Sequence, residues 1–242
     1  MHRNSRVLLF DFDGTISLGD GPVARYAECV AEALQPDDRA DFLAVVQQQK
    51  KIGANSLAIR PIDDYDAVRL AASVFAIPED YLNRAYLRSR ADLAGARAPI
   101  EAVPGLAHYL REIRDDAFLV LATNAPATRI REALDALDLH AAFDDVITSV
   151  GKPSGLTLVL DRLRTVPSDH AFRLLSIGDV WVNDLQPASL QGFQTALIGS
   201  TAPPGATPTY RAERLDELFP VITAWLSHET PGAIVPLPQL ET

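Results

Sequence analysis

A short apolar run near the start of the chain, Val7–Phe10, most constrains the fold. It is too short for a helix of average length and reads as a buried strand of a parallel sheet. The run ends in Asp11-Phe12-Asp13-Gly14, with two carboxylates one residue apart. Side chains alternate along a strand, so Asp11 and Asp13 are expected on the same side, beyond the strand's carboxyl end. Open α/β sheets bind their ligands at that end.

Two converging carboxylates repel each other unless a cation lies between them. Mg²⁺ suits such a pair because it prefers hard oxygen ligands and keeps waters or substrate phosphates in its remaining positions. The alternative is a strand that leads into an ordinary Asp-Gly turn. The whole run favours the metal interpretation, and we therefore predict an Mg²⁺ site that includes Asp11 and Asp13.

Length and charge exclude several classes of protein. The chain has 242 residues, 48% of them apolar, enough for a large core or for a core with an insert. Its formal net charge is −10, with no basic block, so nucleic acid is not expected as a partner. No apolar run is long enough to cross a bilayer and the first six residues show no signal-peptide pattern, so we expect no membrane contact and a cytoplasmic location. The single cysteine, Cys29, falls in an apolar helical pattern and is expected to pack in a core.

The chain changes its pattern near residue 98. Before it, four helical segments are predicted over residues 23–34, 39–49, 65–75 and 78–93. After it, strands alternate with helical segments, among them those over residues 126–137, 183–190 and 215–226, which indicates a parallel sheet with helices on both faces. We therefore predict an α/β protein whose Rossmann-like core, residues 1–17 and 99–228, carries a four-helix insert, residues 18–98. Residues 200–209 are expected to form a loop, and residues 229–242 a tail.

Three later strands are also followed by residues that suit a phosphate or a metal. Thr123-Asn124 comes before a predicted helix start, where a hydroxyl and backbone amides could bind an anion or form a simple turn. Lys152 is one of three lysines in a chain that otherwise uses arginine, although many lysines are merely solvated. Asp179 and Asp184 follow a further strand, where the second carboxylate could instead cap a helix.

These four stretches, in this order, resemble the four motifs of the haloacid dehalogenase-like hydrolases. The resemblance implies that Asp11 attacks phosphorus and forms an aspartyl-phosphate, and that Asp13 protonates the leaving group and later activates water. It also implies that Thr123, with Asn124, binds the phosphate and that Lys152 neutralises charge on the nucleophile and the phosphoryl group. The implied Mg²⁺ ligands are Asp11, Asp13, Asp179 and Asp184. Dehalogenases of the family lack the second aspartate and need no metal, so Asp13 favours phosphoryl transfer.

In the same family the insert corresponds to a helical cap that closes over the site and selects the substrate. Candidates for contact with the substrate are Lys50 and Lys51, with Gly53, Asn55 and Arg60 nearby, although a solvated loop explains these residues as well. The predicted function is Mg²⁺-dependent hydrolysis of a small phosphorylated metabolite by a monomer or homodimer. Three alternatives stay open: a phosphonoacetaldehyde hydrolase with Lys50 or Lys51 as Schiff base, a sugar-phosphate mutase, and a phosphate-binding module without turnover.

Overall fold

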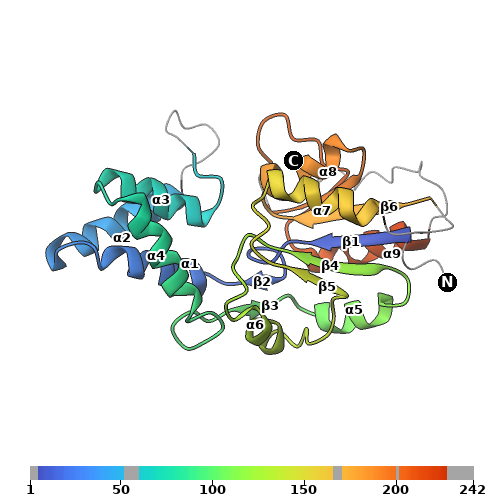
Figure 1. Ribbon diagram of the computed structural model, residues 1–242, viewed down its shortest axis with the longest axis horizontal. Helices are drawn as coiled ribbons and strands as arrows, with labels where there is room; N and C mark the ends of the chain where they lie inside the picture. The colour runs from blue at the N-terminus through green and yellow to red at the C-terminus, as the bar shows by residue number, and fades with distance from the viewer. Residues whose placement is uncertain (1–4, 52–59, 166–170, 200–201, 228–242) are drawn as a thin grey trace, which may run out of the picture. The chain divides into compact units, whose positions relative to one another are not determined.

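The computed structural model describes residues 5–51, 60–165, 171–199 and 202–227 (Figure 1). The predicted tail, residues 229–242, therefore lies outside the described residues, as do the first two residues of the loop expected over 200–209. The chain divides into two compact units. One comprises residues up to Leu18, Ala102–Ala125 and residues from Leu137 onward, and the other comprises Gly19–Glu101 and Pro126–Ala136.

The first unit is built on a parallel sheet of six described strands in the order β5-β4-β1-β6-β7-β8. The strands are β1 (Arg6–Phe10), β4 (Phe118–Ala122), β5 (Asp145–Ile147), β6 (Arg173–Gly178), β7 (Gln194–Ile198) and β8 (Tyr210–Ala212). Strand β1 lies between β4 and β6, so the chain segments after these three strands leave the sheet side by side. The order changes direction at β1, which is where α/β sheets of this kind form their ligand sites.

Helices cover both faces of this sheet, as the alternating pattern predicts. The helices are α5 (Leu106–Ile113), α7 (Ser154–Arg164), α8 (Gln186–Leu190) and α9 (Phe219–Ser227), with a π-helical turn η2 (Trp181–Leu185) before α8 and a 3₁₀ turn η3 (Leu215–Leu218) before α9. Figure 1 shows α7 and α8 on one side of the sheet and α5 on the other. Leucines of α7 pack with Val7, Leu9 and Val120 in one apolar cluster, whereas Tyr109 of α5 stacks on Phe219 of α9.

The second unit is helical. Its described helices are α1 (Gly21–Ala31), α2 (Pro36–Lys50), α3 (Asp64–Val74), α4 (Glu79–Arg90) and the short α6 (Ile130–Ala136). Helices α1 to α4 share a core in which the rings of Tyr26, Tyr65 and Tyr86 contact one another. Cys29 is fully buried in this core.

The α/β fold class is confirmed, and the differences are local. The predicted helix over 126–137 begins only at Ile130, because Arg129 has a left-handed backbone conformation, with φ of 58°, that an α-helix cannot include. The pattern gave no sign of β8 or of the two-residue strands β2 (Ser17–Leu18) and β3 (Glu101–Ala102), which pair with each other. Among the described residues, no helix is both long and apolar enough to span a membrane.

Candidate active site

The loop after β1 carries Asp11. The backbone N–H of Asp11 donates to the carbonyl of Ile177 at 3.0 Å, which holds the end of β1 against β6. A tight turn follows, in which Ile16 N–H donates to the carbonyl of Phe12 at 3.1 Å. Gly14 in this turn has φ of +83°, and a β-carbon there would overlap the Asp179 carboxylate. The glycine thus serves both the backbone conformation and the close approach of Asp179.

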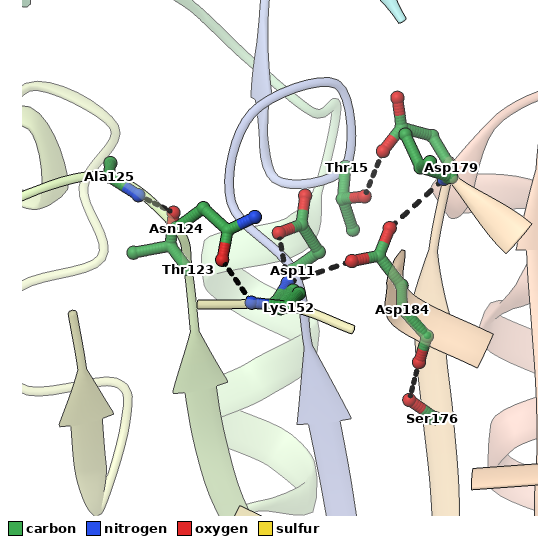
Figure 2. A network of polar contacts seen from close by, with 10 residues as sticks. Asp11, Thr15, Thr123, Asn124, Ala125, Lys152, Ser176, Asp179 and Asp184 are labelled. Atoms are coloured by element: carbon green, nitrogen blue, oxygen red, sulfur yellow. Dashed lines mark hydrogen bonds and ion pairs between the residues drawn. The ribbon is translucent and has the colours of Figure 1, made fainter. Parts of the chain in front are cut away.

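Lys152, from the segment between β5 and α7, lies at the centre of the site (Figure 2). Its Nζ lies 2.5 Å from Oδ1 of Asp11 and 2.8 Å from Oδ1 of Asp184. The Lys152 side chain is only 3% exposed. Its charged hydrogen bonds to the two carboxylates are therefore made away from bulk water, where such bonds are strong.

The segment after β6 supplies Asp179 and Asp184. Asp184 lies in η2, and its Oδ2 accepts a hydrogen bond at 3.0 Å from Val180 N–H. Asp179 accepts a longer bond from the Thr15 hydroxyl, 3.5 Å from Oγ1 to Oδ1. The loops after β1 and β6 are therefore linked through side chains as well as through the sheet.

Three carboxylates come together here. Each of Asp11, Asp179 and Asp184 offers an oxygen, and these oxygens all lie within 4.8 Å of one another. Hard oxygen donors at this spacing fit a divalent cation such as Mg²⁺. Asp13 is not part of this group, so its predicted roles as a metal ligand and as an acid and base stay predictions.

The pKa values of Asp184 and Lys152 reflect this crowding. Burial, reinforced by the charge of Asp11, raises the pKa of Asp184 to about 7 against the opposing effect of Lys152. Burial alone would lower the pKa of Lys152, but the charges of Asp11 and Asp184 outweigh it and raise that pKa above its ordinary value. Lys152 thus stays protonated, while one ammonium does not fully offset the neighbouring acids. A bound cation would supply the missing positive charge.

Thr123 and Asn124, after β4, lie beside the same site (Figure 2). The buried Thr123 hydroxyl accepts a hydrogen bond from Ala125 N–H at 3.0 Å, and the Asn124 carboxamide oxygen accepts one from Lys152 N–H at 2.7 Å. The Asn124 side chain therefore holds the backbone of Lys152 in place through this hydrogen bond. Binding of phosphate by Thr123, Asn124 and Lys152 stays a prediction.

The predicted substrate contacts of the insert have other partners. Lys50 forms ion pairs with Asp64 at 2.7 Å and Asp20 at 3.1 Å, both within the second unit. Burial alone would lower the pKa of Lys50, but its hydrogen bonds and ion pairs with Asp64 and Asp20 raise it, which disfavours the neutral amine that a Schiff base requires. Lys51 is exposed at the end of α2. Gly53 and Asn55 lie outside the described residues, and Arg60 is exposed.

Two hydroxyl residues of this network, Thr15 and Ser176, have no predicted role, and Ser176 is the more deeply involved. Its hydroxyl donates to the backbone carbonyl of Asp184 at 2.6 Å (Figure 2). The available signal was a hydroxyl in the otherwise apolar stretch Leu174-Leu175-Ser176-Ile177, directly before Gly178-Asp179. A buried polar group in such a run requires a partner, and here the partner is a residue of the site.

The chain resembles solved structures along nearly its whole length. A putative HAD-hydrolase from Bacillus subtilis, YfnB, bound to magnesium, is 20% identical with a TM-score of 0.59, over 90% of this chain and 98% of that one. A predicted phosphoglycolate phosphatase from Haemophilus somnus is 16% identical, with the same TM-score and the same coverage. An L-2-haloacid dehalogenase is 19% identical with a TM-score of 0.55, again over 90% and 98%. At these identities the likeness establishes the fold alone.

No curated protein matches the sequence. A family model described as haloacid dehalogenase-like hydrolase matches residues 6–188, about three quarters of the chain. The match includes every strand end that contributes to the site, from Asp11 to Asp184. The chain therefore belongs to the haloacid dehalogenase-like hydrolases.

Proposed function

We propose that this protein is an Mg²⁺-dependent phosphohydrolase that cleaves a small phosphate monoester through an aspartyl-phosphate on Asp11. The observation that carries the proposal is the contact of Asp11 with Lys152 inside a group of three carboxylates. Such a group needs a cation to accept an anionic substrate. The phosphatases among its structural relatives are consistent with this chemistry.

The residues that would hold the cation are Asp11, Asp179 and Asp184, with Asp13 as a further predicted ligand. When bound, Mg²⁺ would reduce the repulsion between the carboxylates and the substrate phosphate and shield charge that develops during transfer. Lys152 supplies a fixed positive charge beside Asp11. Thr123 and Asn124 supply polar groups at the end of β4 for the phosphate oxygens.

In the first step, a carboxylate oxygen of Asp11 attacks phosphorus in line with the ester oxygen. The bond from phosphorus to the leaving oxygen breaks, and Asp13 gives that oxygen a proton. In the second step, Asp13 takes a proton from water, the water oxygen attacks phosphorus, and the bond from Asp11 to phosphorus breaks. Acid-base catalysis of this type contributes about 10²- to 10⁴-fold in rate.

Haloacid dehalogenation is a further reaction to test, beyond the three alternatives left open by the sequence, because solved structures of similar fold include dehalogenases. The presence of Asp13 favours phosphate transfer, since displacement of a halide needs no proton donor. Use of Lys50 as a Schiff base is disfavoured by its two ion pairs.

The proposal is tested with a panel of phosphate monoesters, an aryl phosphate among them, in Mg²⁺ and in chelator. We expect release of inorganic phosphate that requires the metal, and no chloride release from an L-2-chloro acid. Asp11→Asn should abolish turnover with the fold intact, as judged by circular dichroism. Hydrolysis that survives this substitution would exclude Asp11 as the nucleophile, and chloride release without phosphate release would identify a dehalogenase.

A further inference from the structure

Ser176 is a buried hydroxyl on an apolar face of the sheet. In the parallel register it lies beside Leu9 of β1 and Thr195 of β7. Leu9 and Leu174, on the same face, belong to the apolar cluster that packs on α7 and α8. Ser176 is 2% exposed, so its hydroxyl needs a hydrogen bond within the protein.

The partner of this hydroxyl is in the active site. Ser176 Oγ donates to the backbone carbonyl of Asp184 at 2.6 Å, and both atoms are buried. Asp184 belongs to η2, in which Gln186 N–H donates to the carbonyl of Trp181, five residues earlier. Such π-helical turns are rare and occur often at functional sites. Ser176 thus attaches an irregular turn to the rigid centre of the sheet.

The contacts of the Asp184 carboxylate are also tight. Oδ1 contacts Lys152 and Oδ2 accepts from Val180 N–H. A β-carbon on Gly178 would overlap the Asp184 side chain, which leaves that side chain little room to move. Because the carbonyl and the side chain share one Cα, a shift of the carbonyl displaces the carboxylate from Lys152 and from the other two acids.

We propose that Ser176 is a positioning residue: by holding the Asp184 carbonyl, it fixes the Asp184 carboxylate in the geometry that binds the divalent cation. This inference rests on the proposed metal-dependent function. It assigns a role to a residue whose hydroxyl bonds the backbone of a proposed metal ligand and not its carboxylate. Groups that orient metal ligands typically change metal affinity by 10- to 100-fold when removed.

Ser89 offers a matched control. Its hydroxyl also donates to a backbone carbonyl, that of Tyr86 at 2.7 Å, and it is also 2% exposed. It belongs to α4 of the second unit, whereas the acidic residues of the site belong to the first. Ser89→Ala and Ser176→Ala therefore each remove one hydrogen bond from the hydroxyl of a buried serine to a backbone carbonyl, but only the second removes a bond to Asp184.

The experiment is titration calorimetry of the full chain with Mg²⁺ alone, with thermal unfolding of each metal-free variant measured in parallel. We expect Ser176→Ala to weaken Mg²⁺ binding about 10-fold. Ser89→Ala should bind Mg²⁺ like the unmodified protein, whatever its unfolding temperature. Ser176→Thr, which keeps the hydroxyl, should restore most of the affinity. Ser176→Cys, similar in volume to serine but a weak donor, should behave like alanine and replaces Ser176→Ala if that variant does not fold.

Wild-type Mg²⁺ affinity in both Ser176→Ala and Ser176→Cys would overturn the inference, even if the protein is a phosphatase. Equal losses of affinity in the Ser89 and Ser176 variants would also overturn it, because the effect would then be one of general stability. The proposed function fails separately: a protein whose Mg²⁺ affinity depends on Ser176 but which hydrolyses no phosphate ester supports the positioning role and refutes the phosphatase.

Discussion

At the scale of single residues, Lys152 supplies the positive charge that pairs with two of the acids of the site. It contacts Asp11 and Asp184, and its own backbone is held by the Asn124 side chain. Its neighbours come from the ends of three different strands, which only the parallel sheet brings together. The ammonium therefore acts both on the proposed nucleophile and on a proposed metal ligand.

Replacement of Lys152 tests this double role. We expect Lys152→Met to lower kcat for an aryl phosphate about 10²- to 10³-fold, because a fixed charge beside the reacting group is lost. Lys152→Arg should recover little of it, since a planar guanidinium does not fit the place of a 3% exposed ammonium. Steady-state kinetics check both, with Arg111→Met, at an exposed residue of α5, as control. A kcat for Lys152→Met within twofold of the unmodified protein would remove Lys152 from the mechanism.

The residues of the site differ in how well the sequence predicts them. Asp11, Asp179 and Asp184 could be predicted to meet because a carboxylate after an apolar strand is unusual and parallel strands end at one edge. The position of Asp13 relative to these three acids could not be predicted, because it depends on the backbone of the turn from Phe12 to Ser17. The role of Ser176 was not predicted because its hydroxyl bonds the backbone carbonyl of Asp184. Every residue has such a carbonyl, so the sequence does not show which one a hydroxyl will bond.

At the scale of elements, apolar runs predict strands and helices well, whereas their ends depend on backbone detail. The helix expected over 183–190 is a π-helical turn followed by α8, and the one expected over 215–226 starts with the 3₁₀ turn η3. Strand β8 has three residues, too few for a periodic signal. Hydrophobic periodicity does not distinguish these helix types, because it reports which side is buried and not which carbonyl is bonded.

Buried Arg25 of α1 holds the segment that follows α4. Its side chain is 4% exposed, and its Nε donates to Asp92 at 2.6 Å. The neighbouring Leu93 carbonyl accepts from Arg129 Nε at 2.7 Å, just before α6. Two arginines from distant parts of the sequence thus fix this segment within the second unit.

The role of Arg25 gives a prediction of stability. Arg25→Met should lower the free energy of unfolding by about 2 kcal/mol, because Asp92 loses its short ion pair with a buried guanidinium and keeps only the longer one with Arg97 at 3.7 Å. Arg84→Met removes an exposed ion pair with Asp80 and should change stability little. Urea unfolding followed by circular dichroism compares the two. Equal losses in the free energy of unfolding for both substitutions would show that the buried ion pair of Arg25 stabilises the protein no more than an exposed one.

At the scale of the whole molecule, an acidic chain gathers three of its carboxylates at one place. The folded state therefore carries a local repulsion that the unfolded chain lacks. For Asp184 the pKa in the folded state, about 7, is above its ordinary value. The folded protein thus holds a proton that the unfolded chain releases, so the contribution of Asp184 to stability is full at low pH and is lost as pH rises through about 7.

Mg²⁺ should reverse this loss. We expect it to raise the thermal unfolding temperature more at about pH 8 than at about pH 6, because the proton on Asp184 competes with the metal below its pKa. Asp184→Asn should remove most of this pH dependence. Differential scanning calorimetry with Mg²⁺ and with chelator measures it, and the same stabilisation at both pH values would contradict the assignment of Asp184 as a ligand that titrates near neutrality.

The pairing of β2 with β3 has a consequence for how such proteins diversify. Ser17–Leu18 and Glu101–Ala102 lie next to each other, although more than eighty residues separate them in the sequence. The chain therefore leaves the α/β core and returns to it at one place, the β2–β3 pair. In topological terms, residues from Gly19 to Ile100 form a single long insertion between these two strands. Exchange of that insertion for another of different size would remodel the second unit, to which Pro126–Ala136 also belongs, while the six parallel strands keep their own pairing.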